Sequence, residues 1–309
     1  MLARSLAVLL ALELGLYCIA GVWLWSAHGL SPRLAVLAAL ASALAVRFAL
    51  VALSFALAHV YRGQVPATVS LAPRRRIKLY ASEFLAFTLL FTLIQPLAHR
   101  LVTRPDQRTR RLSIPAIVLI PGIYCNAGAW WWMRGRLEAA GLSGLFAATL
   151  EPPLASIDEL ASQLSLQIES LCATTGARRV VLVGHSMGGL IARTYIRNFG
   201  GAARVAKLIT LASPHHGSAL ARWAVGLGGQ QLRPGHPWLA KLNANESEPS
   251  PVPIVSLFSW HDNLVVPQSS AELVHADSIA FVGIGHLSLL FSDEVARRLY
   301  QEISAATQK

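Results

Sequence analysis

The stretch Val180-Val181-Leu182-Val183-Gly184-His185-Ser186-Met187-Gly188-Gly189 decides the fold. Its first four residues are valine or leucine, the composition of a strand that is buried on both faces of a parallel sheet. Gly-x-Ser-x-Gly follows, and from Leu190 apolar residues recur at helical spacing. A strand, a tight turn and a helix in this order predict a nucleophile elbow, which presents a serine hydroxyl above the sheet. We therefore expect Ser186 to be a nucleophile.

The glycines of this motif have a steric purpose. Gly184 and Gly188 must be small, because the strand and the helix approach each other closely on either side of the serine. The bare pattern Gly-x-Ser-x-Gly also occurs by chance in unrelated proteins. The strand before it and the helix after it favour the functional interpretation.

Composition indicates a large domain and a membrane segment. The chain has 309 residues, enough for one large α/β domain and an additional segment. Hydrophobic residues make up 54% of it, which is too much for an ordinary soluble enzyme. The formal net charge is +11, and arginine clusters beside apolar segments favour anionic lipid headgroups over nucleic acid. The three cysteines, Cys18, Cys125 and Cys172, give neither a disulfide framework nor a metal-binding spacing.

Residues 1–99 hold most of the apolar excess, and we interpret them as a membrane region of two or three helices. Residues 4–27 and 34–60 are each long enough to cross a bilayer, and the short turn between them predicts a helical hairpin. A signal peptide is the alternative, but the first stretch is long for one and its cleavage site is poor. Glu13 and Arg47 interrupt the hairpin, and we expect them to pair with each other or to face the bundle interior.

Residues 79–98 leave two alternatives open, a third membrane span or a helix that lies in the plane of the interface. If this segment crosses, basic residues divide evenly between the two sides; if it does not, nearly all of them lie on one side. Hydropathy slightly favours crossing, whereas the charge count favours a segment that does not cross. The side of the membrane on which the C-terminal domain lies therefore stays open. We expect a multi-pass protein of a bacterial inner membrane, with residues 100–113 as a basic linker to the next domain.

Residues 114–309 predict a catalytic domain of the α/β type. Short apolar runs alternate with helical patterns there, which indicates a mostly parallel sheet flanked by helices. The nucleophile elbow expected at Ser186 makes the α/β-hydrolase fold our prediction for this domain. Ser156 begins a capping box, so Asp158 and Glu159 have a structural use and are poor catalytic candidates. The strands we expect are residues 116–120, 180–183, 205–211, 253–260 and 278–282, and a helix over 292–304 is expected to cover the sheet edge.

The acid and the base of a catalytic triad follow the serine in the order Asp or Glu, then His, in this fold. Asp262 leaves the carboxyl end of the strand 253–260, where a carboxylate would orient an imidazole; an ordinary turn residue is the alternative. His286 lies in a Gly-His loop after the last expected strand, the place of the general base. We predict Ser186, Asp262 and His286 as the catalytic residues.

Backbone donors complete the expected site. Pro121-Gly122-Ile123-Tyr124 follows the first strand, and in this fold that loop supplies one N–H group to the oxyanion. We predict Ile123 and Met187 as the oxyanion donors, and the loss of one such donor costs about 3 kcal/mol. Neither a cofactor nor a metal ion is expected, because no histidine–carboxylate spacing resembles a zinc site.

A longer stretch carries a family resemblance. Thr210-Leu211-Ala212-Ser213-Pro214-His215-His216-Gly217 resembles the Thr-x-x-x-Pro-His-His-Gly signature of bacterial triacylglycerol lipases and their relatives, which include the GPI inositol deacylases. Arg233-Pro234-Gly235-His236-Pro237 resembles a later cap-region segment of the same group. The resemblance covers the chain from residue 114 onward. It implies that His215 and His216 are scaffold around the site, and that residues 219–251 form a cap, for which a plain insertion is the alternative.

These observations together predict a membrane-anchored serine hydrolase that cleaves carboxylic esters, lipid esters above all, through an acyl-enzyme intermediate. The expected partners are a lipid or other ester substrate and the bilayer, with no nucleic acid; protein partners stay unknown. A thioesterase, an amidase or an acyltransferase would carry the same triad. A non-catalytic membrane interaction protein is a second alternative. We expect the side chain of His185 to point away from the reaction.

Overall fold

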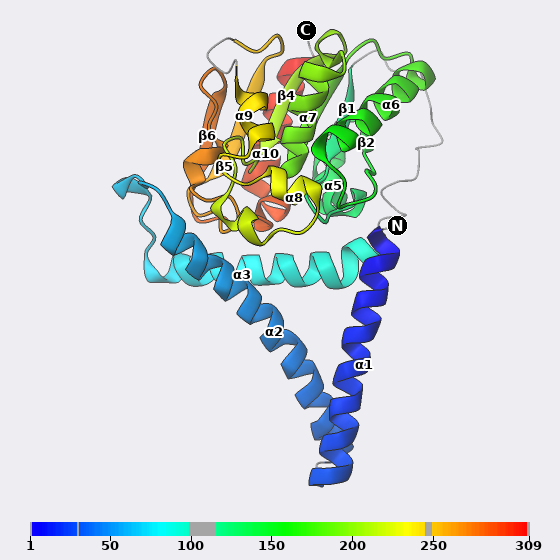
Figure 1. Cartoon of the computed structure of the whole chain (residues 1–309), viewed down its shortest axis with the longest axis vertical. Helices are drawn as coiled ribbons and strands as arrows, with labels where there is room; N and C mark the ends of the chain where they lie inside the picture. Colours follow the sequence, from blue (N-terminus) through cyan, green and yellow to red (C-terminus); the bar gives the residue numbers. More distant parts are fainter. Residues whose placement is uncertain (1, 30, 99–114, 245–248, 308–309) are drawn as a thin grey trace.

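The computed structural model describes residues 2–29, 31–98, 115–244 and 249–307. A sheet domain lies at one end of the molecule and a set of long helices at the other (Figure 1). The predicted linker, residues 100–113, lies outside the described residues.

Six parallel strands form the sheet of the C-terminal domain, in the order β2-β1-β3-β4-β5-β6. They are β1 (Ala116–Ile120), β2 (Leu145–Ala147), β3 (Val180–His185), β4 (Val205–Leu211), β5 (Ile254–Ser259) and β6 (Asp277–Phe281). The five expected strands are confirmed, with ends that differ by up to two residues. β2 was not expected, because three residues are too few to show a pattern.

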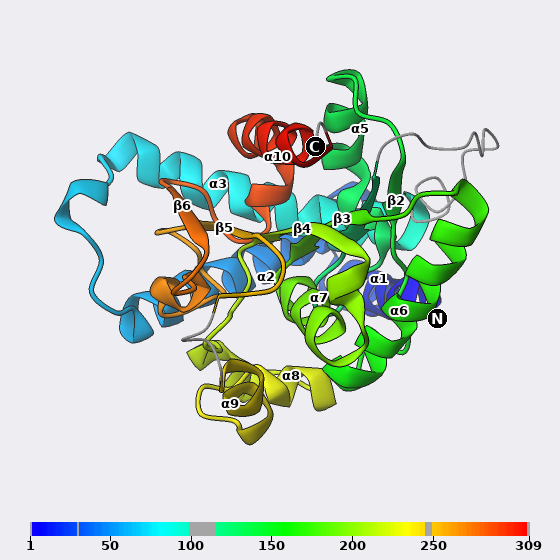
Figure 2. The same ribbon diagram turned by 90° about the horizontal axis from the view of Figure 1, so that it is seen from above.

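Helices cover both faces of the sheet (Figure 2). α6 (Ile157–Thr175) and α7 (Met187–Asn198) lie on one face, and α5 (Trp131–Ala139) and α10 (Asp293–Thr307) lie on the other. The expectation that the last helix covers the sheet edge is wrong. Leu299 of α10 is fully buried in the same cluster as Val181 and Ile209 of the central strands, so this helix packs on a face.

Shorter elements connect these layers. Ser156 is confirmed as the N-cap of α6, since its hydroxyl accepts a hydrogen bond from the backbone N–H of Glu159 at 3.2 Å. The remaining short elements of this domain are η3 (Ala127–Trp130), η4 (Gly201–Ala203), η5 (Ala219–Trp223), α8 (Leu227–Gln231), α9 (Pro237–Asn243), η6 (Gln268–Ala271) and η7 (Ser288–Phe291).

The turn between β3 and α7 has the strained geometry of a nucleophile elbow. Ser186 has φ 55° and ψ −127°, a backbone conformation that residues other than glycine rarely adopt. A Cβ atom on Gly188 would lie 2.5 Å from the carbonyl oxygen of Ile120, and one on Gly184 would lie 2.6 Å from the backbone of Gly188. Both glycines are therefore required by the close approach of α7 to β1 and β3.

The N-terminal region contains α1 (Leu2–His28), α2 (Pro32–Tyr61) and α3 (Pro73–Leu89), which continues as the π-helical segment η2 (Leu90–Ala98). Each of these three helical segments is long and apolar enough to cross a membrane. At 1.5 Å per residue, α1 and α2 are about 40 and 45 Å long, more than the roughly 30 Å hydrocarbon core of a bilayer. Figure 1 shows α1 and α2 converging at the end far from the sheet, with α3 lying across them beneath the sheet domain.

The charged residues inside the hairpin pair with each other, as expected. The guanidinium of Arg47 donates two hydrogen bonds to the carboxylate of Glu13, at 2.6 and 2.8 Å. Its Nε donates a third to the hydroxyl of Thr92 in η2, at 3.2 Å. The ion pair therefore links α1, α2 and η2.

The N-terminal helices pack against the carboxyl edge of the sheet. α2 contacts η5, α3 contacts η7, and η2 contacts η3. Each of these three short elements follows the carboxyl end of a strand, namely β4, β6 and β1. The edge at which α/β proteins carry their ligand sites is therefore covered by the candidate membrane helices.

The close packing at the elbow gives a stability prediction. Gly188→Ala should lower the free energy of unfolding by about 1–3 kcal/mol, because the added methyl group would overlap the backbone of β1. Gly135→Ala is the matched control. Gly135 lies within α5 with open space around it, so the change should add about 0.5–1 kcal/mol through helix propensity. Unfolding of the detergent-solubilised protein measures both, and equal stabilities for the two variants would contradict the packing argument.

Candidate active site

Ser186 lies where the loops after β1 and β3 meet. Its backbone N–H donates to the carbonyl of Leu211 in β4 at 2.8 Å, and the residue is largely buried. A Cβ on Gly122 would lie 2.8 Å from the Cβ of Ser186. The predicted oxyanion loop therefore passes directly against the predicted nucleophile.

Asp262 and His286 form a buried hydrogen-bonded pair. His286 Nδ1 donates to Asp262 Oδ2 at 2.8 Å, and both side chains are almost completely buried. The other carboxylate oxygen, Oδ1, accepts from the backbone N–H groups of Leu264 at 2.7 Å and Val265 at 2.8 Å. These bonds hold the carboxylate in place and leave Nε2 as the ring nitrogen of His286 that is free for proton transfer.

His185 connects this pair to the elbow. Its ring lies 4.7 Å from the ring of His286, centroid to centroid, and its Nε2 lies 3.3 Å from the carbonyl oxygen of His286. His185 was expected to point away from the reaction, but its ring packs against the ring of the predicted base. Burial, together with the nearby charge of His286, holds the pKa of His185 well below its ordinary value, so this ring is neutral.

The environment of His286 raises its pKa. Burial alone would lower the pKa, but the charge of Asp262, the hydrogen bond to Asp262 and the charge of Glu83 together raise it above the ordinary histidine value of 6.5. The Asp262 carboxylate is the largest of the raising influences. A carboxylate beside a histidine stabilises the imidazolium that forms when the histidine removes a proton.

The two predicted oxyanion donors each adjoin a residue of the elbow contact: Met187 follows Ser186 in the chain, and Ile123 follows Gly122, whose position lies against Ser186. Met187 is the first residue of α7, so its N–H has no acceptor inside the helix. Ile123 follows Gly122 in the loop after β1. α8 packs over both residues, since a Cβ on Gly228 would lie 3.1 Å from Met187 Sδ and one on Gly229 would lie 3.3 Å from Ile123 Cδ1.

The segment 219–251 is tied to the rest of the domain at several points. The hydroxyl of Tyr124 donates to the carbonyl of Val225 and accepts from its N–H, both at 2.7 Å. Asp158 accepts a hydrogen bond from the indole of Trp238, which agrees with the structural use expected for this residue. Val225 and Trp238, from the described part of this segment, therefore pack against the loop after β1 and against α6, and the cap stays a prediction.

The first histidine of the signature motif, His215, packs inside the domain. His215 is fully buried, and its Nε2 lies 3.0 Å from the hydroxyl of Thr210. The carbonyl of His215 accepts a hydrogen bond from the Asn243 side chain at 2.8 Å. Burial, with the charge of Arg193 as the next cause, holds the pKa of His215 well below its ordinary value. These contacts make His215 a link between β4 and α9.

Four polar residues beside the predicted triad were missed by the sequence interpretation. Glu83 of α3 and Asn263 contact the His286 loop, Ser54 of α2 contacts Asn263, and Gln95 of η2 contacts the loop after β1. The available signal was a polar residue within or beside an apolar stretch, which marks a functional or buried site more often than a lipid-facing one.

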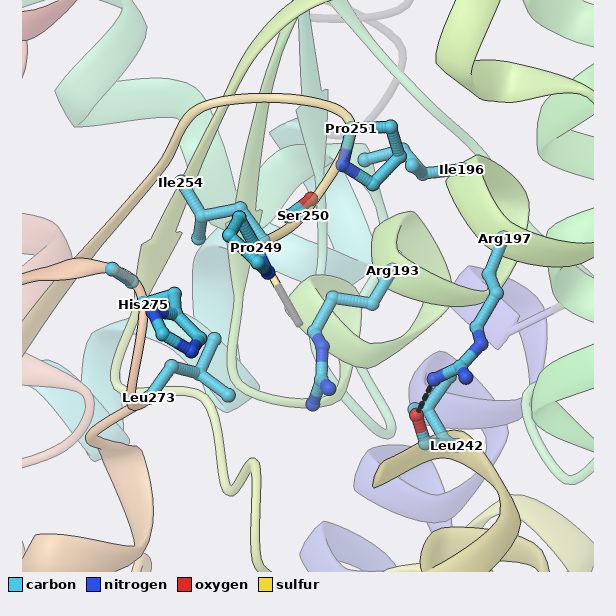
Figure 3. A pocket seen from close by; sticks show the side chains of 11 residues that line it. Arg193, Ile196, Arg197, Leu242, Pro249, Ser250, Pro251, Ile254, Leu273 and His275 are labelled. Atoms are coloured by element: carbon cyan, nitrogen blue, oxygen red, sulfur yellow. Dashed lines mark hydrogen bonds between the residues drawn. The ribbon is translucent and has the colours of Figure 1, made fainter. Parts of the chain in front are cut away.

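A separate cavity lies at the opposite edge of the sheet (Figure 3). It is lined by the last turns of α7 and by residues at the amino ends of β5 and β6, including Ile254 and His275. Arg193 and Arg197 from α7 bind Asn243 and the carbonyl of Leu242, so they hold α9 against the domain. This cavity is remote from Ser186. Within the described parts of the chain, no group of three or more His, Cys, Asp and Glu side chains could hold a metal ion.

Comparison with known proteins agrees with this fold. Residues 158–247 match the family model described as PGAP1-like alpha/beta domain. The mature form of lipase BlEst2 from Bacillus licheniformis has a TM-score of 0.56 at 18% identity, covering 66% of this chain and 96% of that one. Lipase B of Aspergillus fumigatus has a TM-score of 0.56 at 16% identity, covering 68% of this chain and 57% of that one. The C-terminal domain has the α/β-hydrolase fold.

The raised pKa of His286 gives a pH prediction. Below pH 6.5 the protonated ring stabilises the folded state, and this contribution is lost as pH rises through the folded-state pKa. In NMR spectra of histidine-labelled protein, His286 should titrate above pH 6.5, whereas His185 and His215 should stay neutral well below it. Asp262→Asn should move the His286 titration to lower pH. An unmoved titration would show that Asp262 is not what raises this pKa.

Proposed function

We propose that this protein is a membrane-anchored serine hydrolase that cleaves carboxylic esters, and that lipid esters are its substrates. The observation that carries the proposal is the buried Asp262–His286 pair, which contacts His185 of a nucleophile elbow whose serine has φ 55°. The α/β-hydrolase fold and the structural likeness to lipases support it.

The proposed reaction uses the three residues in their usual order. Ser186 Oγ attacks the carbonyl carbon of the ester while His286 Nε2 removes the hydroxyl proton. The bond from the carbonyl carbon to the alcohol oxygen then breaks, and His286 returns the proton to the departing alcohol. A water molecule, deprotonated by the same ring, hydrolyses the acyl-enzyme and releases the acid. Asp262 keeps the imidazole oriented through Nδ1 and stabilises its protonated form.

Two backbone groups are proposed to stabilise the developing negative charge. The N–H groups of Ile123 and Met187 would donate to the oxygen of the tetrahedral intermediate, and one such donor contributes about 3 kcal/mol. Gly122 keeps the first donor near the serine, because a side chain at this position would collide with Ser186.

Lipid esters are proposed as substrates because the candidate membrane helices lie at the edge that holds Ser186. The face of α3 and η2 turned away from the sheet domain carries exposed apolar side chains, among them Ile77, Leu85 and Leu93. Such a surface suits the acyl-chain region of a bilayer. A substrate in the membrane would therefore meet the site without leaving the lipid phase.

We further propose that α1 and α2 span the membrane and that α3 lies in its interface. The N-terminus of α1 contacts the sheet domain through a bond from the Leu2 N–H to Glu151, at 3.1 Å. One face of α3 buries Glu83 against the same domain, a contact that an in-plane helix can keep. Basic side chains at the domain side of the helices are Arg4, Arg62, Arg74, Arg75, Arg76 and Lys78, against Arg33 at the far turn. The positive-inside rule then puts the hydrolase domain in the cytoplasm.

Reporter fusions in a bacterial host test this topology. Green fluorescent protein fused to the C-terminus should fluoresce, and alkaline phosphatase at the same position should be inactive, because the fusion point lies in the cytoplasm. A phosphatase inserted after His28 should be active, since the far turn faces the other side. An active phosphatase at the C-terminus would mean that α3 crosses the membrane.

Labelling with a fluorescent fluorophosphonate tests the chemistry. Wild-type protein should label, and Ser186→Ala and His286→Ala should not, because the probe reacts only with an activated serine. Asp262→Asn should slow labelling by about 10³- to 10⁴-fold. Asp158→Asn is the matched carboxylate control and should label at the wild-type rate.

Folded wild-type protein that fails to label in detergent and in lipid vesicles would refute the hydrolase proposal and favour a non-catalytic interaction protein. Labelling that persists in Ser186→Ala would identify a different nucleophile. A panel of esters, thioesters and amides, assayed on one purified preparation, then separates an esterase from a thioesterase or an amidase. Acyl transfer to an alcohol acceptor would indicate an acyltransferase.

A further inference from the structure

One carboxylate of the N-terminal region is buried in the hydrolase domain. Glu83 of α3 is 1% exposed. Its Oε1 accepts from the backbone N–H of Leu287 and its Oε2 from that of Ser288, both at 2.9 Å. These two residues directly follow His286. Glu83 lies so close to Gly285 that this position has no room for a Cβ atom.

The His286 loop offers a row of donors that requires such an acceptor. The backbone N–H of Gly285 donates to the hydroxyl of Ser288 at 2.9 Å, and that of His286 donates to Asn263 Oδ1 at 3.0 Å. With the two bonds to Glu83, four successive N–H groups are held by side chains. Successive N–H groups create a local positive potential, which an anionic carboxylate satisfies better than a neutral group.

The second contact to this loop also leads back to the candidate membrane helices. Asn263, which directly follows Asp262, donates from Nδ2 to the hydroxyl of Ser54 in α2 at 2.8 Å. Asn263 thus bridges α2 to the backbone of His286. The acid loop and the base loop are therefore joined to α2 and α3 through buried or half-buried polar groups.

A third loop is held in the same way. Gln95 of η2 is fully buried, and its Oε1 accepts from the backbone N–H of Asn126 at 2.8 Å. Its own carbonyl accepts from the Asn126 side chain at 3.0 Å. Asn126 lies three residues after Ile123, in the loop that is proposed to bind the oxyanion. Every loop of the proposed site outside the elbow therefore contacts an N-terminal helix.

We propose that Glu83 is a positioning residue for His286. In this proposal α3 contributes a residue to the active site in addition to anchoring the protein. The inference rests on the proposed function. Glu83 touches no reacting atom; it fixes the backbone that carries the imidazole relative to Asp262 and Ser186. Displacement of a catalytic group by about 1 Å can cost about 100-fold in rate, so a loosened loop should have a measurable effect.

Glu83→Gln is the informative change. The amide has nearly the same shape, but one of its two acceptors becomes an NH₂ donor that would face an N–H donor of the loop. It also removes a charge near His286. Among the described residues, the titratable groups that face His286 are Asp262 from the loop after β5, His185 from β3 and Glu83 from α3. Loss of Glu83 should therefore move the acid limb of the rate profile to lower pH.

The experiment uses the full-length protein in detergent. End-point labelling with fluorophosphonate counts the competent serines, and p-nitrophenyl butyrate hydrolysis gives kcat, KM and the pH profile. For Glu83→Gln we expect a normal end point, a kcat lower by about 10- to 100-fold, a little-changed KM and an acid limb at lower pH. Ser82→Ala is the control on the same helix, because its hydroxyl donates to the carbonyl of Leu79 within α3, at 3.0 Å, and Ser82 forms no hydrogen bond with the His286 loop in the described part of the chain. It should behave as wild type.

Two outcomes overturn the proposal. Glu83→Gln with wild-type kcat and pH profile would show that the loop needs no carboxylate. An end point that falls in proportion to kcat, with the acid limb unmoved, would show that Glu83 only docks α3. If Glu83→Gln fails to fold, Glu83→Asp replaces it: the shorter carboxylate cannot reach both N–H groups, so kcat should fall, and unchanged kcat would overturn the proposal. Failure of the wild type to label refutes the hydrolase function instead, which keeps the two proposals distinguishable.

Discussion

The close contact between α7 and β1 is the constraint on which the rest of the hydrolase domain depends. The chain turns from strand to helix at a single residue, Ser186, and this is possible only because Gly184 and Gly188 present no side chain to the opposing backbone. The turn leaves the serine at the carboxyl edge of the sheet, between the loops that follow β1 and β4. Asp262 and His286 reach the same edge from β5 and β6, since parallel strands all end there.

The second constraint is the junction between the sheet and the N-terminal helices. Open α/β domains leave their carboxyl edge to loops and caps, whereas here α2, α3 and η2 cover part of it. A polar side chain within an apolar helix is costly to bury unless its hydrogen bonds are made. Glu83 and Gln95 make theirs to backbone groups of the hydrolase domain. The junction is therefore specific in geometry, unlike a flexible tether between an anchor and a soluble domain.

Residues with local signals were predictable from the sequence, and residues with long-range partners were not. Ser186 stands in a contiguous strand–turn–helix pattern, and Asp262 and His286 follow strands in a fixed order. The sequence interpretation also named the pairing of Glu13 with Arg47 as one of two alternatives, since both are charged residues in neighbouring apolar helices. Glu83 gave only a weak signal, because its partners lie about two hundred positions away in the sequence. These partners are backbone N–H groups, which nearly every residue type has, so the sequence does not mark them. The orientation of His185 depended on the His286 loop, and so on tertiary contacts as well.

The ion pair between Glu13 and Arg47 bears on how the protein is made. Translation proceeds from the N-terminus, so α1, α2 and α3 are complete before any strand of the sheet has been synthesised. Arg47 joins α1, α2 and η2 through Glu13 and Thr92, and Ser54, Glu83 and Gln95 lie on α2, α3 and η2. The hydrolase domain then folds against partners that already exist. Assembly of the three loops that Ser54, Glu83 and Gln95 contact is in this way coupled to the packing of the N-terminal helices against one another.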